Sequence, residues 1–395
     1  MIALPMKRSW LVPAVLALVT VVAGPLASAR AGVAAPGVSL AVSPRVITYG
    51  QWVHFSGRTS LHTSGQVVRV VDGQGDVVAR ATTSADGSYH AARRLSRSMV
   101  VHAEWTAVRS RRFSVGVRPR LTASRTAIRL FDTTVVTGAL APHLAGSHIN
   151  VTLWRGGNPV ERFRPVLLRA GTFRVGIKIR KPGQQSVVVR FKDGEHIGVA
   201  WRSAPETPPL PALGNGSSGI YVRLLEHRLA ALHYRVFAFD GRFDYHDGDS
   251  ILAFHKVQGM ARTSSVDRAT WYALASPKVP VLRGPRKGNH FEVDLTKQVV
   301  YYVQKGRLIA ILHTSTGKPS TPTRPGDFHV WSKQPGTNAE GMYYSSFFDG
   351  SRALHGYPEV PPYAASHGCV RLPFWHARWV YDRAPIGIEV LVYNS

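Results

Sequence analysis

Runs of β-branched and aromatic residues recur between residues 38 and 205, and Gly, Asp or Pro interrupts the chain after each run. Short apolar runs bounded by turn residues are typical of β-strands. The clearest runs cover residues 67–71, 150–154 and 186–190. This part of the chain is therefore predicted to be rich in strands.

The same part of the chain contains an internal repeat. Its first copy has Leu40, Ser43, Ile47 and Gly57, and its second has Leu121, Ser124, Ile128 and Gly138. The offset is 81 residues throughout, and the tetrapeptide at 86–89 is paralleled at 170–173. The repeat predicts two tandem immunoglobulin-like β-sandwiches, residues 32–117 and 118–205. Whether they are spacers or bind carbohydrate is left open, because a fold does not fix a function.

A proline-rich linker, PETPPLP at residues 205–211, separates this region from a stretch with a different apolar spacing. Apolar residues then recur every three or four positions, as on one face of a helix. The expected elements are a helix capped by Ser218 and reaching residue 232, a helix around residues 251–257, and a third over residues 266–274. A helical domain over residues 206–276 is predicted.

Strand-type runs return after a second linker, residues 277–288, which is rich in Pro, Arg and Lys. Residues 291–295 and 298–303 predict a hairpin around Thr296-Lys297, and residues 308–312 a third strand. The predicted fold class is mainly β and multidomain, with the last domain at residues 289–395.

The first 31 residues have the features of a secretory signal peptide. Lys7 and Arg8 precede an apolar run over residues 10–23, and small residues end at Ala27-Ser28-Ala29. The run is shorter than the ~20 residues that span a bilayer. An exported protein is predicted, and contact with a membrane is expected only if this segment stays uncleaved as an anchor.

Charge is distributed unevenly along the chain. Residues 31–205 contain 25 basic and 8 acidic residues, a net charge of +17, whereas residues 206–395 have a net charge of only +6. A basic surface attracts polyanions. For an exported protein these are anionic cell-wall polymers and lipid headgroups. Nucleic acid is not an expected partner, because no zinc-finger spacing, basic helix or RNA-binding strand motif is present.

The only cysteine, Cys369, lies in the stretch HGYPEVPPYAASHGCVR at residues 355–371. A thiol of ordinary acidity needs a base to react, and His355 and His367 are the candidates. Gly368 allows a sharp bend, and the N–H groups of Gly368 and Cys369 are expected to form an oxyanion hole. A lone thiol in an exported protein has no internal disulfide partner, so a catalytic role is favoured over an inert buried cysteine.

The pattern HG followed by SHGCVR resembles the signature of the L,D-transpeptidase (YkuD-type) family, and the resemblance covers residues 289–393. It implies that Cys369 is the nucleophile, His355 the base and His367 the second motif histidine. The positions expected to bind substrate are Arg371, Ser366 and Gly356, although a structural ion pair is an equal alternative for Arg371. The implied domain is mostly β, with a short helix at about 374–381 and a last strand at 388–393.

A loop at residues 315–328 also resembles the family's StG…TPtP.G.f element. Its Gly and Pro residues suit tight turns at the edge of a pocket, so Thr321 and Thr323 are expected to be structural rather than catalytic.

Residues 213–276 resemble a three-helix peptidoglycan-binding module without a gap. Its pattern is matched by Leu213-Gly214, Gly219, Val222, Leu225, Leu229, Tyr234, Asp240-Gly241, Phe243, Phe254, Gly259, Asp267 and Thr270-Trp271. The departures are Asp244, Asp247 and His255, where the family usually has Gly, Thr and Gln.

Together the resemblances imply an exported enzyme that acts on peptidoglycan stem peptides without a cofactor or metal. Cys369 would form a thioester, release D-alanine and pass the acyl group to an amine. Papain-like and NlpC/P60-type peptidases are disfavoured, because their Cys precedes the His. Two alternatives stay open: an L,D-carboxypeptidase that uses water as the acceptor, and an inert wall-binding scaffold.

Overall fold

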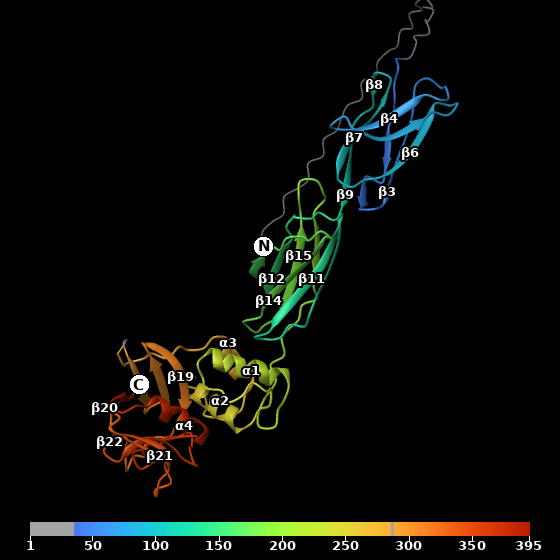
Figure 1. Cartoon of the computed structure of the whole chain (residues 1–395). Coiled ribbons are helices and arrows are strands. Elements are labelled where there is room, and N and C mark those ends of the chain that lie inside the picture. Colours follow the sequence, from blue (N-terminus) through green and yellow to red (C-terminus); the bar gives the residue numbers. More distant parts are fainter. Residues whose placement is uncertain (1–34, 286–287) are drawn as a thin grey trace, which may run out of the picture. The chain divides into compact units, whose positions relative to one another are not determined.

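The computed structural model describes residues 35–285 and 288–395 (Figure 1). The predicted secretory signal, residues 1–31, lies outside these ranges. No helix within them is both long and apolar enough to cross a membrane. Strands predominate over helices, so the predicted fold class is confirmed.

The first repeat folds into two sheets. Its strands are β1 (Ala41–Ser43), β2 (Val46–Thr48), β3 (Trp52–Arg58), β4 (Val67–Asp72), β5 (Val77–Thr82), β6 (Ser88–Arg94), β7 (Met99–Trp105), β8 (Val108–Arg109) and β9 (Phe113–Arg118). One sheet has the order β1-β3-β6, and the other has the order β2-β9-β7-β4-β5 with β8 paired to β7. Buried and exposed residues alternate along β3 and β9, as in sheets with one face on a core.

The second repeat also forms two sheets. Its strands are β10 (Arg120–Arg125), β11 (Thr133–Ala141), β12 (Asn150–Arg155), β13 (Asn158–Phe163), β14 (Thr172–Lys178), β15 (Gln185–Phe191) and β16 (Val199–Arg202). The sheet orders are β10-β11-β14 and β13-β12-β15-β16. The three runs that the sequence marked most clearly are β4, β12 and β15, so these predictions are confirmed.

Two glycines show that the repeats are equivalent in packing. A Cβ atom at Gly57 on β3 would lie 2.7 Å from Cε1 of Tyr89, and one at Gly138 on β11 would lie 2.5 Å from Cε1 of Phe173. Each position therefore needs glycine, because a ring lies directly on the strand backbone. The two aromatic residues end the repeated tetrapeptides, so the sequence repeat corresponds to one packing arrangement used twice.

Three helices follow: α1 (Ile220–Ala231), α2 (Tyr245–Gln258) and α3 (Arg268–Ala275). The prediction that Ser218 caps α1 is wrong. The helix begins after Gly219, whose φ of 104° suits glycine, and no side chain caps it. Ser218 lies one residue too early and instead forms a β-bridge with Arg242.

The three departures from the peptidoglycan-binding pattern have structural roles. Asp244 accepts a hydrogen bond from the Asp247 N–H, and the Asp247 side chain accepts one from the Asp244 N–H, which makes a reciprocal cap for α2. His255 is buried and lies 2.9 Å from both the Thr263 carbonyl and the Thr270 hydroxyl. These residues therefore stabilise the helical fold.

The C-terminal domain has two sheets and one helix. Its elements are β17 (Asn289–Asp294), β18 (Val299–Gln304), β19 (Arg307–His313), β20 (Gly326–His329), β21 (Ser332–Thr337), β22 (Tyr343–Asp349), β23 (Arg352–Gly356), β24 (Val370–Leu372), α4 (Phe374–Arg383) and β25 (Glu389–Tyr393). The sheet orders are β19-β18-β17-β25-β20 and β21-β22-β23-β24. The expected hairpin, third strand, late helix and last strand are all present.

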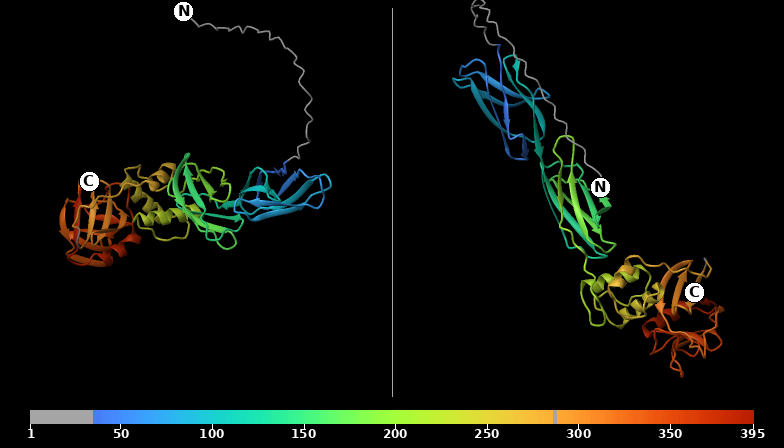
Figure 2. Two further views of the ribbon diagram at one scale, coloured as in Figure 1. Left: turned by 90° about the horizontal axis from the view of Figure 1, so that it is seen from above. Right: turned by 180° about the vertical axis from the view of Figure 1, so that it is seen from behind.

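The helical region packs directly against the C-terminal domain, as both views in Figure 2 show. Tyr234 forms a parallel bridge with Ile311 of β19, and the Ile311 N–H donates to the His233 carbonyl at 2.8 Å. The Arg235 guanidinium lies over the rings of Trp375 and Trp379 of α4. The two regions therefore share one continuous packed interface.

Candidate active site

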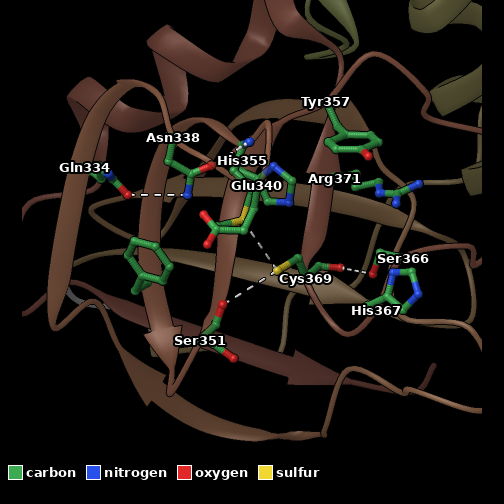
Figure 3. A pocket seen from close by; sticks show the side chains of 12 residues that line it. Gln334, Asn338, Glu340, Ser351, His355, Tyr357, Ser366, His367, Cys369 and Arg371 are labelled. Carbon is green, nitrogen blue, oxygen red and sulfur yellow. Dashed lines mark hydrogen bonds between the residues drawn. The ribbon is translucent and has the colours of Figure 1, made fainter.

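The candidate residues come together through the pairing of β23 with β24. These strands are parallel, and their register places His355 beside Arg371 and Leu354 beside Val370. Cys369 immediately precedes β24, so the two segments of the HG…SHGCVR motif lie next to each other (Figure 3). The chain between them is the Pro-rich loop of residues 357–368.

A pocket of about 530 Å³ contains the thiol. Its lining comes from β21, β22, β23, the loops between them and the motif: Gln334, Asn338, Glu340, Met342, Phe347, Ser351, His355, Tyr357, Ser366, His367, Cys369 and Arg371. Figure 3 shows these side chains arranged around Cys369. Five of the seven predicted site residues line it directly, and the exceptions are Gly356 and Gly368.

His355 is buried and held in a defined orientation. Its Nδ1 lies 2.9 Å from the Gly356 carbonyl, which can only accept, so Nδ1 carries the proton and Nε2 has a free lone pair. Burial lowers the pKa of His355 to about 4, and the charge of Arg371 acts in the same direction. The imidazole is therefore neutral at neutral pH, as a general base must be.

Cys369 is half-buried, and burial raises the pKa of its thiol. The Ala353 N–H and the charges of Arg352 and Arg371 act in the opposite direction without cancelling this shift. The sulfur lies 3.8 Å from the Ser351 carbonyl and 4.0 Å from the Met342 sulfur. No hydrogen bond joins it to His355 within the described ranges, so the pair rests as a neutral thiol and a neutral imidazole.

One of the two N–H groups expected to form the oxyanion hole is engaged within the turn. The Gly368 N–H is already used, because it donates to the Ser366 hydroxyl at 3.0 Å. That hydroxyl in turn donates to the Cys369 carbonyl at 2.6 Å. The Cys369 N–H makes no hydrogen bond within the described part of the chain, and it is the donor left for an oxyanion.

Gly368 and Ser366 therefore shape the turn that presents the thiol. Gly368 has a φ of +117°, and a Cβ there would lie 2.8 Å from Nε of Arg352. Thr321 donates to the Ser366 carbonyl and Thr323 to the Gly368 carbonyl, which agrees with the predicted structural role of both threonines. Ser366 lines the pocket, and its expected contact with substrate stays a prediction; both hydrogen bonds of its hydroxyl are made within the turn.

Gly356 was expected to bind substrate, and this stays a prediction; the structure shows that Gly356 packs against α4. It lies outside the pocket, and a Cβ there would lie 2.7 Å from Cβ of Ala377 and 3.0 Å from Cδ1 of Phe374. Gly356 thus allows α4 to pack on β23, while its carbonyl orients His355.

His367 and Arg371 lie at the rim of the pocket. His367 is exposed, and its Nε2 lies 3.2 Å from Nζ of Lys318. The Arg371 guanidinium lies 4.0 Å from the centre of the Tyr357 ring. Within the described ranges no carboxylate pairs with Arg371, so the alternative of a structural ion pair finds no support.

Sequence reasoning missed Tyr357 and the residues between β21 and β22. Tyr357 follows the HG pair directly, so its position in the motif could have identified it. Asn338, Glu340 and Met342 lie in a connecting segment whose sequence shows no chemical pattern, and only the fold brings them to the thiol. No group of three or more His, Cys, Asp or Glu side chains in the described ranges is placed to hold a metal ion.

A single thiol and an oriented neutral imidazole that line one pocket are the groups that cysteine-dependent acyl-transfer enzymes use. Residues 288–392 match the family model of YkuD, the L,D-transpeptidase catalytic domain. The chain belongs to this family through that domain. The resemblance of residues 213–276 to a peptidoglycan-binding module stays a prediction.

Solved structures with similarity to the chain include two from the same group of enzymes. An L,D-transpeptidase from Xylanimonas cellulosilytica DSM 15894 is 32% identical over 47% of this chain and 100% of its own, with a TM-score of 0.45. An L,D-transpeptidase from Stackebrandtia nassauensis is 25% identical over 46% of this chain and 95% of its own, with a TM-score of 0.31. No curated protein matches the chain.

Proposed function

We propose that this chain is an exported L,D-transpeptidase that cross-links peptidoglycan through a thioester on Cys369. The observation that carries the proposal is that the chain's only cysteine and His355, whose Nδ1 is held by the Gly356 carbonyl, line the same pocket. The family of the catalytic domain supplies the substrate class, stem peptides of the cell wall.

The first half-reaction forms the thioester. Nε2 of His355 takes the thiol proton as the sulfur attacks the carbonyl carbon that precedes a terminal D-alanine. The Cys369 N–H donates to the oxyanion that results. The imidazolium then returns the proton to the leaving amine as the C–N bond breaks, so D-alanine departs and the acyl group remains on the sulfur.

The second half-reaction transfers the acyl group. The amine of another stem peptide attacks the thioester, His355 accepts its proton, and the thiol is restored when that proton reaches the departing sulfur. Water in place of the amine gives the L,D-carboxypeptidase reaction with the same residues. Arg371, whose guanidinium faces the pocket from the Tyr357 ring, would hold a stem-peptide carboxylate by a forked contact.

Mass spectrometry of products from a purified tetrapeptide muropeptide tests the proposal. We expect cross-linked dimers and free D-alanine from the wild-type chain, and neither product from a Cys369→Ala variant. Free tripeptide without dimers would assign the carboxypeptidase reaction instead. If the wild-type chain leaves the muropeptide unchanged, the alternative of an inert wall-binding scaffold is favoured.

A further inference from the structure

Lys256 is a buried cation that enters the catalytic domain from outside it. It belongs to α2, is 3% exposed, and directs its ammonium group at the ends of β18 and β19. Nζ donates to the Gln298 carbonyl at 2.9 Å and to the Thr314 carbonyl at 2.8 Å, and it lies 2.6 Å from Nδ1 of His313. These three partners use all three donors of an ammonium group.

No carboxylate bonds to Lys256 within the described residues. Burial lowers its pKa to about 6, but the three groups around Nζ are all acceptors, which the charged ammonium satisfies and the neutral amine does not. A buried charge without an ionic partner lowers the stability of the fold, and an apolar side chain of the same length would fill this site at a smaller loss of stability. Its position is therefore better explained by the groups it holds than by stability.

The first group that Lys256 holds is His313, which connects it to the loop between His355 and Cys369. Because Nδ1 of His313 accepts from Lys256, the imidazole proton lies on Nε2. Nε2 donates to the Val360 carbonyl at 2.8 Å. His313 is fully buried, so it can hold this loop in one position.

The second group is Thr314, which connects Lys256 to the strand that follows Cys369. The Thr314 carbonyl accepts from Lys256, and the Thr314 hydroxyl donates to the Arg371 carbonyl at 2.6 Å. Ser315 continues the contact, because its backbone exchanges hydrogen bonds of 3.1 and 2.9 Å with Arg371. Arg371 follows Cys369 by two residues, so this contact fixes where β24 begins.

A second cation of the helical region holds the same loop. Arg262 follows α2, and its guanidinium donates to the Pro362 carbonyl at 2.7 Å and to the Thr296 carbonyl at 2.8 Å. Arg262 therefore contacts the loop that leads to Cys369 directly, whereas Lys256 reaches the same loop through His313.

We propose that Lys256 is a positioning residue for the acyl-transfer reaction, acting through His313 and Thr314 on the loop and strand that carry Cys369. The helical region is then a part of the catalytic machinery in addition to any role in wall binding. The inference rests on the proposed function, because it assumes that Cys369 is the nucleophile.

The test compares Lys256→Met with Lys278→Met in the full chain. Met keeps the length of the side chain but removes all three donors. Lys278 is the matched control, because the one hydrogen bond that its ammonium makes within the described residues goes to the Gln258 carbonyl of the helical region. The measurement is acylation of Cys369 by a carbapenem, followed by mass spectrometry over a range of carbapenem concentrations, with a thermal melt of each variant.

We expect Lys256→Met to lower the maximal acylation rate roughly 10- to 100-fold, because small displacements of a reacting group cost that much. The half-saturating carbapenem concentration should change less than about threefold, since the pocket walls remain in place. Lys278→Met should acylate like the wild type. A folded Lys256→Met variant with the wild-type maximal rate would overturn the inference.

Thr314→Val provides a second test that does not depend on the folding of Lys256→Met. It removes only the hydroxyl that links the Lys256 acceptor to the Arg371 carbonyl, and we expect a lower maximal rate here too. The double variant should lose less than the product of the two separate losses, because both substitutions act through Thr314 on the backbone of Arg371. Wild-type acylation by Thr314→Val, or fully multiplicative losses, would contradict the coupling.

These outcomes are separable from a failure of the proposed function. If the carbapenem does not acylate the wild-type chain at all, Cys369 is not the nucleophile and the proposed function fails. If the carbapenem acylates the wild-type chain and Lys256→Met equally fast, only the positioning role of Lys256 is contradicted.

Discussion

At the scale of single residues, the protonation states of Cys369 and His355 determine how the thiol reacts. Burial raises the pKa of Cys369 above its ordinary value of 9.0 and lowers that of His355 to about 4. In the proposed mechanism Cys369 would therefore be activated during attack and not stored as a thiolate, in contrast to enzymes with a preformed thiolate–imidazolium pair.

The raised pKa predicts slow alkylation of Cys369 by iodoacetamide at neutral pH. The rate should rise with pH and reach its midpoint at a higher pH than for N-acetylcysteine, because iodoacetamide reacts with the thiolate. The chain has one cysteine, so the mass of the intact protein reports this site alone. A midpoint below that of N-acetylcysteine would mean that a preformed thiolate exists.

The two histidines are predicted to contribute unequally. His355→Ala removes the oriented base and should lower carbapenem acylation about 10²- to 10⁴-fold, the usual contribution of general-base catalysis. His367 is exposed and contacts Lys318, so His367→Ala should cost far less. The acylation rates of the two variants at neutral pH provide the measurement, and equal losses would reverse the assignment of the base.

At the scale of elements, the contact between β23 and α4 leaves no space at Gly356. Gly356→Ala would force Ala377 and Phe374 of α4 away from the strand, and overpacking of this kind costs about 1–3 kcal/mol. Urea unfolding should reveal the loss. Gly194→Ala is the control, because a Cβ there meets nothing within 4 Å. Equal midpoints for both variants would show that α4 is free to move.

Glu226 of α1 gives the helical region a pH-dependent stability. Its side chain is buried and accepts hydrogen bonds from the Gly241 N–H, and burial raises its pKa to about 7. A raised pKa in the folded state contributes stability that is complete below pH 4.5 and is lost as pH rises through about 7. Burial of the charged form is therefore unfavourable above neutral pH.

Glu226→Gln should consequently raise the melting temperature at pH 8 and have less effect, or a destabilising one, at pH 5. The measurement is a thermal melt of wild type and variant at both pH values. Glu195→Gln, at an exposed position, is the control and should show no such pH-dependent difference. A shift of the same size at both pH values would show that Glu226 does not ionise in this range.

At the scale of the whole molecule, the uneven charge predicts electrostatic binding to an anionic wall. We expect a fragment of residues 32–205 to bind purified wall sacculi, and this binding should weaken steeply with salt, because exposed charges are screened over ~10 Å at 0.1 M. Stripping the anionic polymers from the sacculi should also weaken it. A fragment of residues 206–395 should respond less, since its net charge is only +6.

Two results would contradict the prediction that residues 32–205 target the protein to the wall. One is the absence of binding by the 32–205 fragment at low salt. The other is equal retention of both fragments at high salt, which would assign binding to contacts other than charge. In either case the two sandwiches would be spacers.

The sequence by itself determined most of the elements and the candidate for the reactive group. Periods of two and 3.6 residues are local properties, so the strands β4, β12 and β15 and the helices α1, α2 and α3 could be predicted from short windows. Cys369 and His355 could be identified for a similar reason, since the motif and the rarity of cysteine are visible in the chain itself.

Only the tertiary structure decided which groups remain free to act. The Gly368 N–H is used by Ser366, Gly356 faces α4, and Arg371 lies on Tyr357. The Lys256 ammonium reaches His313, 57 residues further along the chain. These outcomes depend on the register of β23 against β24 and on how α2 packs against β19. Contacts between distant segments fix the partner of each donor and acceptor, and no local pattern of residues contains that information.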